Sequence, residues 1–305
     1  MAIYHDGELA VQERAGSRHA AGTVAAIVRT DIPDAARLFL AAQPMIVIGA
    51  ADSRGDLWAS VLTGEAGFIT VTGPSSLTVR AAPGPYDPLH AALAGTARVG
   101  VIAIDPGTRR RMRMNGTAHR TAENTLDIEL QQVYANCPKY IQKREPRWQS
   151  ATPGRPRHAG ELTSEDMAFV HATDTFFVAT ADLEGNADAS HRGGHPGFLT
   201  AVDPTHLRWP DYLGNSMFNT LGNLEVNPKA GLLLPDWATG TLLHLTGTAT
   251  VDWDPDRAAA LPGAQRVVDF TVERAVRVDH ASPLRWSAPE FSRFNPPVSL
   301  EGSTA

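Results

Sequence analysis

Residues 45–72 read MIVIGAADSRGDLWASVLTGEAGFITVT, and residues 175–202 read TFFVATADLEGNADASHRGGHPGFLTAV. At a shift of 130 residues the two stretches are identical at nine of 28 positions, whereas average composition predicts roughly two. Each begins with a short apolar run typical of a buried strand and continues into an Asp-x-x-Gly turn. The repeated stretch therefore predicts a strand, a tight turn and a second strand, occurring once in each half of the chain.

The correspondence continues toward the C-terminal end of each half. Two further pairs of segments match, with apolar runs in the first pair and apolar–polar alternation in the second: 101–104 with 231–234, and 126–131 with 268–273. Both patterns are typical of strands. A period this long indicates domain duplication, because solenoid repeats span about 20–50 residues. We predict a mainly β protein built from two tandem closed β-barrels with flanking helices.

The duplication divides the chain into five segments. We predict an N-terminal arm at 1–30, a first barrel at 31–149, a linker at 150–160, a second barrel at 161–286 and a tail at 287–305. The linker is rich in proline, glycine and basic residues, which is typical of a domain boundary.

Composition limits the classes of function. The 305 residues are 43% hydrophobic and 20% charged, with a net charge of −6, which favours neither nucleic acid nor an anionic membrane as a partner. No apolar run reaches membrane length and the start lacks a signal peptide, so we expect a cytoplasmic protein. A single cysteine excludes an internal disulfide framework. The histidines show no metal-ligand spacing and no Gly-x-Ser-x-Gly motif occurs, so neither a metal site nor a hydrolase is predicted.

Five stretches carry a resemblance to a known family: Gly7–Arg14, Arg109–Gly116, Asn136–Gln142, Ser190–Gly194 and Pro210–Asn215. They are similar to the pyridoxamine 5′-phosphate oxidase-like, FMN-binding split-barrel family, above all to its double-barrel branch, which contains the sequence Asn-Cys-Pro-Lys-Tyr-Ile-Gln. The resemblance implies two six-stranded Greek-key split barrels with FMN at the interface between them. In ordinary members that interface forms a homodimer. Here one chain could supply both barrels, and a homodimer of the whole chain is a further expectation.

The resemblance also implies a phosphate site in the second barrel that is less basic than in the oxidases. Ser190 stands where the oxidases carry an arginine and His195 where they carry a lysine, while Asn219 and Thr220 fall on a second basic pair. This disfavours pyridoxamine phosphate as a substrate. Arg192 restores one positive charge, and strand alternation places it on the same face as Ser190.

Neighbouring residues complete the predicted cofactor site. Backbone N–H groups of Gly193 and Gly194 can face the N5/O4 edge of a flavin. Asp211 and Tyr212 border its dimethylbenzene or ribityl region. His191 alternates onto the opposite strand face from Arg192 and is interpreted as structural.

Two other segments are candidates for contact with the flavin. The stretch 219–223, which ends at Asn223, opens a predicted helix whose N-terminus favours a phosphate, although a simple helix cap explains the same residues. In the other segment, after the last strand of the first barrel, Lys139 offers a cation and Tyr140 a stacking surface. Cys137 is interpreted as a small buried residue without a redox role.

Arg109, Arg111 and Arg113 alternate along a predicted strand and would share one face. Such a row can protect an exposed sheet edge from aggregation. It can equally form an anion site at the barrel interface, as part of an FMN pocket or of a second ligand site.

The leading hypothesis is an FMN-dependent oxidoreductase that takes electrons from a small molecule, with NADH or NADPH as a candidate donor. No catalytic side chain is assigned. The alternatives are a non-catalytic flavin binder or redox sensor, and a protein of this fold that binds haem or the deazaflavin F420. Fold alone does not choose among them.

Overall fold

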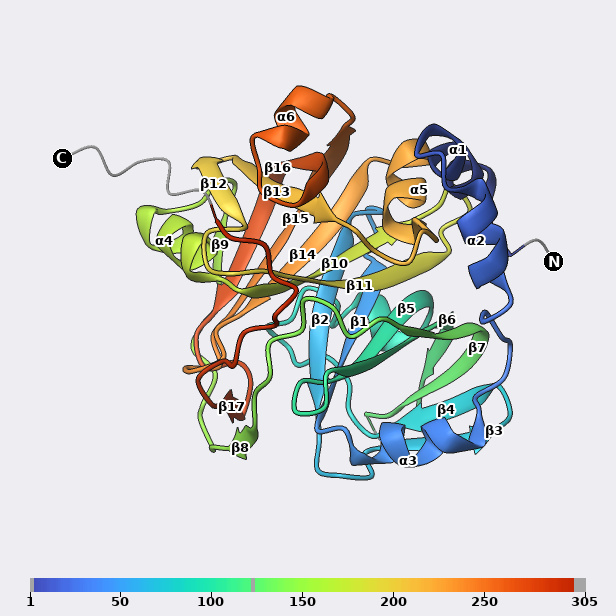
Figure 1. The fold of residues 1–305 in the computed structure, drawn as a ribbon. Coiled ribbons are helices and arrows are strands. Elements are labelled where there is room, and N and C mark those ends of the chain that lie inside the picture. The colour runs from blue at the N-terminus through green and yellow to red at the C-terminus, as the bar shows by residue number, and fades with distance from the viewer. Residues whose placement is uncertain (1–2, 122–123, 299–305) are drawn as a thin grey trace.

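The computed structural model describes residues 3–121 and 124–298 and is dominated by two antiparallel sheets (Figure 1). The first sheet has seven strands: β1 (Met45–Ala51), β2 (Leu57–Thr63), β3 (Ile69–Gly73), β4 (Ser76–Val79), β5 (Thr96–Asp105), β6 (Arg110–Arg120) and β7 (Leu126–Asn136). The second has eight: β9 (Arg157–Ala159), β10 (Thr175–Ala181), β11 (Ala187–Gly193), β12 (Thr200–Asp203), β13 (His206–Tyr212), β14 (Lys229–Pro235), β15 (Leu242–Asp252) and β16 (Ala264–Val278). The short strands β8 (Pro146–Trp148) and β17 (Leu284–Trp286) pair with each other.

The two sheets have the same topology. Strand order is β2-β1-β5-β6-β7-β4-β3 in the first and β11-β10-β14-β15-β16-β13-β12 in the second, with β9 added beside β16. The predicted duplication into two tandem barrels is therefore confirmed. Closed barrels were the wrong expectation, because β2 and β3 end one hydrogen-bond path and β11 and β12 end the other. Each barrel is split, and two strand edges remain free in each.

Strand pairing corrects the predicted overlay by one residue. Gly100 pairs with Gly49 of β1, and Gly231 pairs with Ala179 of β10. Since Gly49 and Ala179 are equivalent, Gly100 matches Gly231 and Val101 matches Leu232, a shift of 131 rather than 130. The difference matters because a one-residue slip moves every side chain to the opposite face of a strand.

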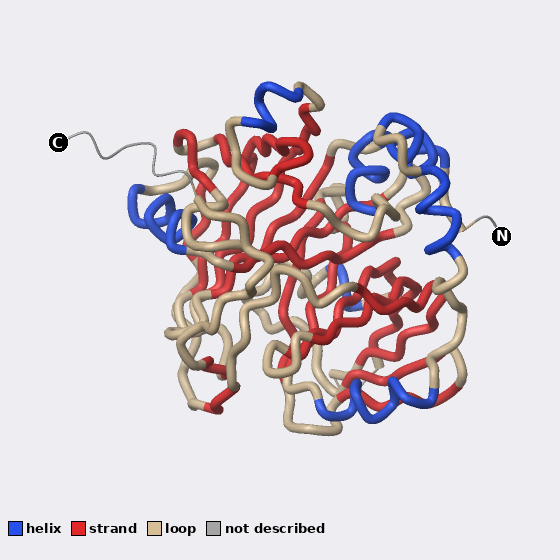
Figure 2. The backbone as a smooth tube through the Cα atoms, in the orientation of Figure 1, coloured by secondary structure: helices blue, strands red, loops and turns tan. Residues whose placement is uncertain are grey.

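Helices cover the outside of the two barrels, as Figure 2 shows. They are α1 (Asp6–Arg14), α2 (Arg18–Ala25), α3 (Asp34–Ala42), α4 (Ser164–Ala172), α5 (Asn219–Val226), α6 (Pro255–Ala259) and a 3-10 turn at Ala92–Ala94. The N-terminal arm forms α1 and α2, and α1 packs closely on α5 of the second barrel. Residues 287–298, predicted as part of a tail, also pack on the protein: Ser292 N–H donates to Gln142, and Phe291 lies against His195.

Each barrel has its own apolar core, and a third apolar cluster joins them. Phe177 and Leu233 of the second barrel pack there against Met45, Val47 and Ile102 of the first. This explains why β1 and β10 are buried on nearly their whole length. A strand that faces a barrel core on one side and the partner barrel on the other exposes no face to water.

Close backbone contacts at this seam require glycine. A Cβ atom at Gly231 would lie 2.3 Å from the Leu57 carbonyl oxygen, and one at Gly100 would lie 2.4 Å from the backbone of Asp188 and Ala189. The two contacts are related by the duplication. They bring β2 and β14, and β5 and β11, close together.

We expect Gly231→Ala to lower the free energy of unfolding by about 1–3 kcal/mol, because the added methyl group forces the two barrels apart. Gly22→Ala is the matched control. Gly22 lies within α2 with nothing within 4 Å of its Cβ position, so alanine should raise the free energy of unfolding by about 0.5–1 kcal/mol. Urea denaturation of both variants measures the difference. Equal stability of the two would show that the seam tolerates separation.

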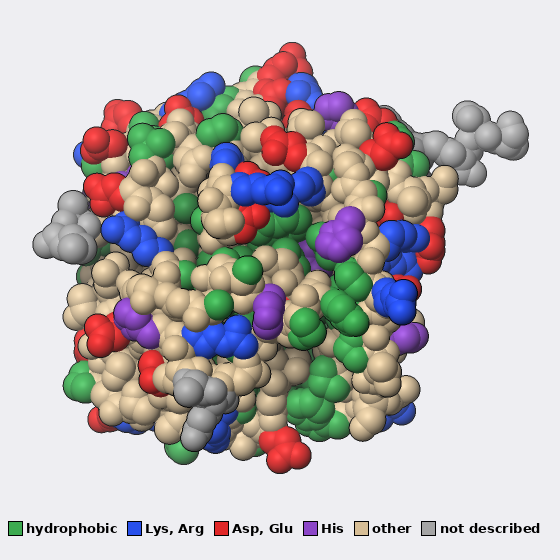
Figure 3. Space-filling view, turned by 180° about the vertical axis from the view of Figure 1, so that it is seen from behind, with side chains coloured by type: hydrophobic (Ala, Val, Ile, Leu, Met, Phe, Trp, Pro, Cys, Tyr) green, Lys and Arg blue, Asp and Glu red, His purple; other side chains and the backbone are tan. Residues whose placement is uncertain are grey.

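Surface and membrane features are ordinary. On the face shown in Figure 3, basic and acidic side chains of the described part of the chain are interspersed. Within residues 3–121 and 124–298, no helix combines the length and the apolar character needed to cross a bilayer.

Candidate functional site

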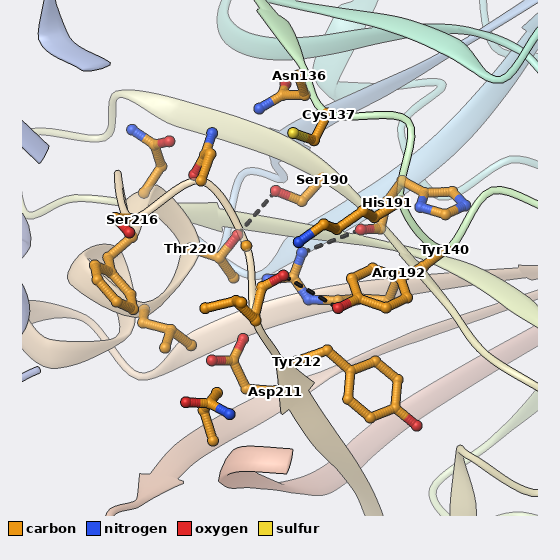
Figure 4. A pocket seen from close by; sticks show the side chains of 18 of the residues that line it. Asn136, Cys137, Tyr140, Ser190, His191, Arg192, Asp211, Tyr212, Ser216 and Thr220 are labelled. Atoms are coloured by element: carbon orange, nitrogen blue, oxygen red, sulfur yellow. Dashed lines mark hydrogen bonds between the residues drawn. The ribbon is translucent and has the colours of Figure 1, made fainter. Parts of the chain in front are cut away.

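A cavity of about 1170 Å³, counted to its open mouth, lies at the seam of the two barrels. Its walls come from β6 and the segment after β7 in the first barrel, and from β11, β13 and α5 in the second. Ala15 and Ser17 of the N-terminal arm complete the wall. Figure 4 shows Asn136 and Cys137 on one side of this cavity and Asp211 on the other.

The cavity brings together most of the residues predicted for the cofactor site. Eight of the eleven line it: Lys139, Ser190, Arg192, Gly193, Asp211, Tyr212, Asn219 and Thr220. They come from four separate elements of the chain, and they converge because the free edge of β11 faces the first barrel.

The other three predicted residues lie close by but outside the lining. Gly194 packs against the ring of Phe198, where a side chain would collide. The ring of His195 lies 4.7 Å from that of Phe291, centroid to centroid. Asn223 is a buried residue of α5, and its Nδ2 donates a hydrogen bond of 2.9 Å to Thr180 Oγ1. These residues support the surroundings of the cavity.

The start of α5 forms one end of the cavity. Ser190 Oγ and Thr220 Oγ1 are 2.9 Å apart and hydrogen-bonded (Figure 4). Phe218, which precedes the helix, has a φ of 61° and provides no side-chain cap. The first N–H groups of α5 therefore lack a capping oxygen, and a helix N-terminus in this state favours an anion.

The N-terminal arm supports this end of the cavity. Asn219 donates a hydrogen bond to the buried carboxylate of Glu8, and Gln12 Nε2 donates one of 3.1 Å to the Met217 carbonyl. Burial raises the pKa of Glu8, although His5, Asn219 and Arg113 oppose this. The sequence did not indicate these contacts, because the arm and α5 are more than two hundred residues apart.

Four arginines line the cavity, and two of them have a carboxylate partner among the described residues. Arg113 forms a buried ion pair with Asp188. Arg192 Nη1 donates a hydrogen bond of 3.1 Å to the His191 carbonyl, and Arg111 Nη1 donates one of 2.9 Å to His191 Nδ1. Within the described part of the chain, the Nε atoms of Arg111, Arg113 and Arg192 are buried without a hydrogen-bond partner. Buried donors without partners are rare in proteins, so these atoms point to a ligand that accepts hydrogen bonds.

Burial also destabilises the charges of these arginines. It lowers the pKa of Arg192, and together with the positive charges of Arg113 and Arg192 it lowers the pKa of Arg111 to about 9. A bound anion would reverse part of this effect. Asp211 does not fully neutralise these buried arginines, because its carboxylate already forms an ion pair with Arg266 at 2.8 Å.

His191 lines the cavity, although its alternation with Arg192 predicted a purely structural position. The reason is that β11 is the terminal strand of its sheet, so side chains on both faces border the free edge. Arginine can only donate, so Nδ1 of His191 accepts from Arg111 and the ring proton is assigned to Nε2. That Nε2 atom is buried without a partner. Burial and the two neighbouring arginines hold the pKa of His191 well below its usual value, so the ring is neutral.

The arginine row predicted on one strand is only partly present. Arg109 lies in the turn before β6 with a φ of 54° and forms an ion pair of 2.9 Å with Glu290. Arg111 and Arg113 share the face that borders the cavity. The prediction was wrong for Arg109, because the strand begins one residue later.

The segment after β7 provides the opposite wall. The ring centroids of Tyr140 and Tyr212 lie 5.1 Å apart, and Tyr140 Oη donates a hydrogen bond of 3.1 Å to the Leu213 carbonyl. Cys137 is exposed and lines the cavity, contrary to the predicted burial. Lys139 also lines it and lies 5.8 Å from the ring of Phe294.

The duplicated position at the other side of the seam is apolar. By strand register Leu242 replaces Arg111 and Val61 replaces His191. The small space there is lined by Val61, Leu242, Trp237 and Trp286. Ser60, which matches Ser190, donates a hydrogen bond of 2.6 Å to Asp87 Oδ1. Arg111 and His191 therefore have no polar counterpart at the duplicated position, which the structure describes in full.

Parts of the chain are similar to known proteins. Residues 162–282 match the family model of pyridoxamine 5′-phosphate oxidase. No curated protein matches the chain. Similar solved structures include a provisionally assigned pyridoxamine 5′-phosphate oxidase from Lactobacillus delbrueckii, 24% identical over 38% of this chain and 94% of that one, with a TM-score of 0.33. An FMN-binding protein from Syntrophomonas wolfei is 10% identical, and the match covers 37% of this chain and 84% of that one, with a TM-score of 0.28. HupZ from Group A Streptococcus is 17% identical, and the match covers 40% of this chain and 96% of that one, with a TM-score of 0.32.

Residues 162–282, which include most of the second barrel, are therefore similar to the pyridoxamine 5′-phosphate oxidase family. The first barrel repeats its topology strand for strand. Membership of the double-barrel branch and the residue limits of the domains stay predictions.

Proposed function

We propose that this protein binds FMN in the cavity between its barrels and acts as an FMN-dependent oxidoreductase on a small molecule. The observation that carries the proposal is the pair of buried Nε donors on Arg111 and Arg192, next to the uncapped start of α5. Hydroxyl groups, guanidinium donors and helix N–H groups are the usual partners of a phosphate. The residues present therefore fit a phosphorylated cofactor.

Each wall has a role in this arrangement. Ser190, Arg192, Thr220 and the first turn of α5 would hold the phosphate. Gly193 offers a backbone N–H to the ring system, and the Tyr140–Tyr212 pair covers it from solvent. When bound, FMN supplies hydride acceptance at its N5 atom. The protein positions the cofactor and excludes water, and no acid–base side chain is assigned.

One observation disfavours haem as the ligand. The buried histidine of the cavity, His191, carries its proton on Nε2 because Nδ1 accepts from Arg111. A histidine ligand to iron needs a free lone pair on the coordinating nitrogen. F420 shares the phosphate chemistry and is separated from FMN by direct titration of each cofactor.

Titration with FMN and with riboflavin tests the proposal. Quenching of flavin fluorescence should show FMN binding about tenfold or more tightly than riboflavin, since only FMN reaches the phosphate donors. Anaerobic mixing of the FMN complex with NADH or NADPH then tests catalysis by these two donors. Equal affinity for the two flavins would place the phosphate elsewhere. A flavin that neither nucleotide bleaches would support the alternative of a binder or redox sensor.

We further expect one FMN per chain. The duplicated position lacks the arginine and histidine of the cavity, and Trp237 and Trp286 line the small space there. Equilibrium dialysis against excess FMN, with flavin counted per polypeptide, measures this ratio. Two flavins per chain would contradict the apolar assignment of the second position.

A further inference from the structure

Helix α1 lies outside both repeats of the duplication, yet it packs on the copy that contributes α5 to the cavity. It precedes the first barrel in the chain and lies against α5 of the second (Figure 1). In the first barrel, the equivalent stretch between β4 and β5 contains the 3-10 turn Ala92–Ala94 in place of a full helix. Helix α1 is therefore attached to the copy that is proposed to bind the cofactor phosphate.

Helices α1 and α5 meet at two glycines. A Cβ atom at Gly7 would lie 2.2 Å from the Gly222 carbonyl oxygen, and one at Gly222 would lie 2.5 Å from the Cα atom of Glu8. The two backbones are therefore in direct contact at this point. Close-packed contacts of this kind transmit displacements, so a movement of α1 is passed on to α5.

Polar side chains of α1 hold the turn that leads into α5. Glu8, which is only 4% exposed, accepts a hydrogen bond from the side chain of Asn219, the first residue of α5. Gln12 Nε2 donates to the Met217 carbonyl just before the helix. Helix α1 thus fixes both sides of Phe218, the residue of left-handed conformation at which α5 starts. The N–H groups proposed to face the phosphate follow in the first turn of α5.

The buried carboxylate of Glu8 is an unusual way to hold this turn. Glutamate is rarely buried so deeply. Burial raises the pKa of Glu8 even though hydrogen bonds from His5 and Asn219 and the charge of Arg113 oppose the shift. A residue that costs folding free energy in this way is expected where it serves a functional site.

We propose that helix α1 positions the phosphate-binding turn, with Glu8 as the positioning residue, so that docking of α1 on α5 and binding of the cofactor phosphate strengthen each other. This inference rests on the proposed function and adds to it an element that does not touch the phosphate. The effect passes through Asn219 and the Met217 carbonyl. Such coupling is reciprocal: the factor by which docked α1 raises FMN affinity is also the factor by which FMN stabilises the docking.

Fluorescence titration of Glu8→Ala with FMN and with riboflavin tests one direction of this coupling. We expect FMN affinity to fall about tenfold, since Asn219 loses a charge-assisted hydrogen bond, while riboflavin affinity changes by less than about twofold. Glu8→Gln keeps an acceptor oxygen for Asn219 and should recover most of the loss. Glu13→Gln is the matched control, because Glu13 lies on the same helix with its side chain 74% exposed. It should bind both flavins as the natural protein does.

Hydrogen exchange of the α1 backbone amides in the natural protein tests the other direction. At saturating FMN these amides should exchange about tenfold more slowly than in the flavin-free protein, whereas riboflavin should give no comparable protection. Gly7→Ala disturbs the contact with α5 and leaves Glu8 in place, so it should also lower FMN affinity selectively. Thermal unfolding of each variant checks that the barrels remain folded.

This inference and the proposed function fail in different ways. Equal protection of α1 by FMN and riboflavin, or equal loss of both flavins in Glu8→Ala, would overturn the role of α1 and leave FMN binding intact. A protein that binds no FMN would refute the proposed function. Inorganic phosphate added to the flavin-free protein is then the probe: slower exchange of the α1 amides would support their coupling to an anion at α5, and unchanged exchange would overturn it.

Discussion

Arg192→Ala is expected to weaken FMN binding by about 10- to 100-fold, because a hydrogen bond to a charged group contributes about 1.5–3 kcal/mol. Arg192 is held in the cavity wall by a single hydrogen bond to a carbonyl. Among residues 3–121 and 124–298 no carboxylate is bonded to it, and its buried Nε is without a partner. Its removal therefore takes away a phosphate donor without leaving an acid unpaired. The flavin-free protein should keep its stability.

Fluorescence titration of flavin-free protein with FMN measures this effect, and riboflavin serves as the internal control. The loss should be confined to FMN, since riboflavin carries no phosphate. Arg110→Ala is the matched variant on the surface and should bind both flavins as the natural protein does. If Arg192→Ala weakened FMN and riboflavin equally, the arginine would contact the ring system and not the phosphate.

Arg113→Ala is expected to have its main effect on stability, with a loss of about 3–5 kcal/mol in the free energy of unfolding. Arg113 and Asp188 form a buried ion pair across the seam of the two barrels. Without the arginine, the Asp188 carboxylate stays buried and uncompensated. Such a charge is far more costly than the loss of the pair itself.

Urea denaturation of the flavin-free protein measures this change. The double variant Arg113→Ala, Asp188→Ala should recover part of the lost stability, since it removes both charges together. In the folded protein, FMN affinity should fall less for Arg113→Ala than for Arg192→Ala. The opposite order would mean that the phosphate lies at Arg113, and an unchanged free energy of unfolding would show that the ion pair contributes nothing.

The duplication could be predicted from the sequence because it depends on local patterns. Strand periodicity, the Asp-x-x-Gly turns and the matching glycines all act within a few residues, and they recur in both halves. The same local signals located the segments that line the cavity, namely β11, β13 and the start of α5. Eight of the eleven predicted cofactor residues lie in that lining as a result.

Tertiary structure decided which of these side chains have a partner. His191 and Arg111 are 80 residues apart, and they meet only because the free edge of β11 faces β6 of the other barrel. Alternation along a strand assigns faces correctly, but it does not show that an edge strand can present both faces to one cavity.

The sequence by itself determined two repeats, their strands and the positions of the polar segments. The packing of one barrel on the other determined which charges are neutralised, with Arg113 paired to Asp188 and Arg192 left without a carboxylate partner. The physical reason is range: strand patterns are set by neighbouring residues, whereas burial and ion pairing across the seam depend on contacts between distant parts of the chain.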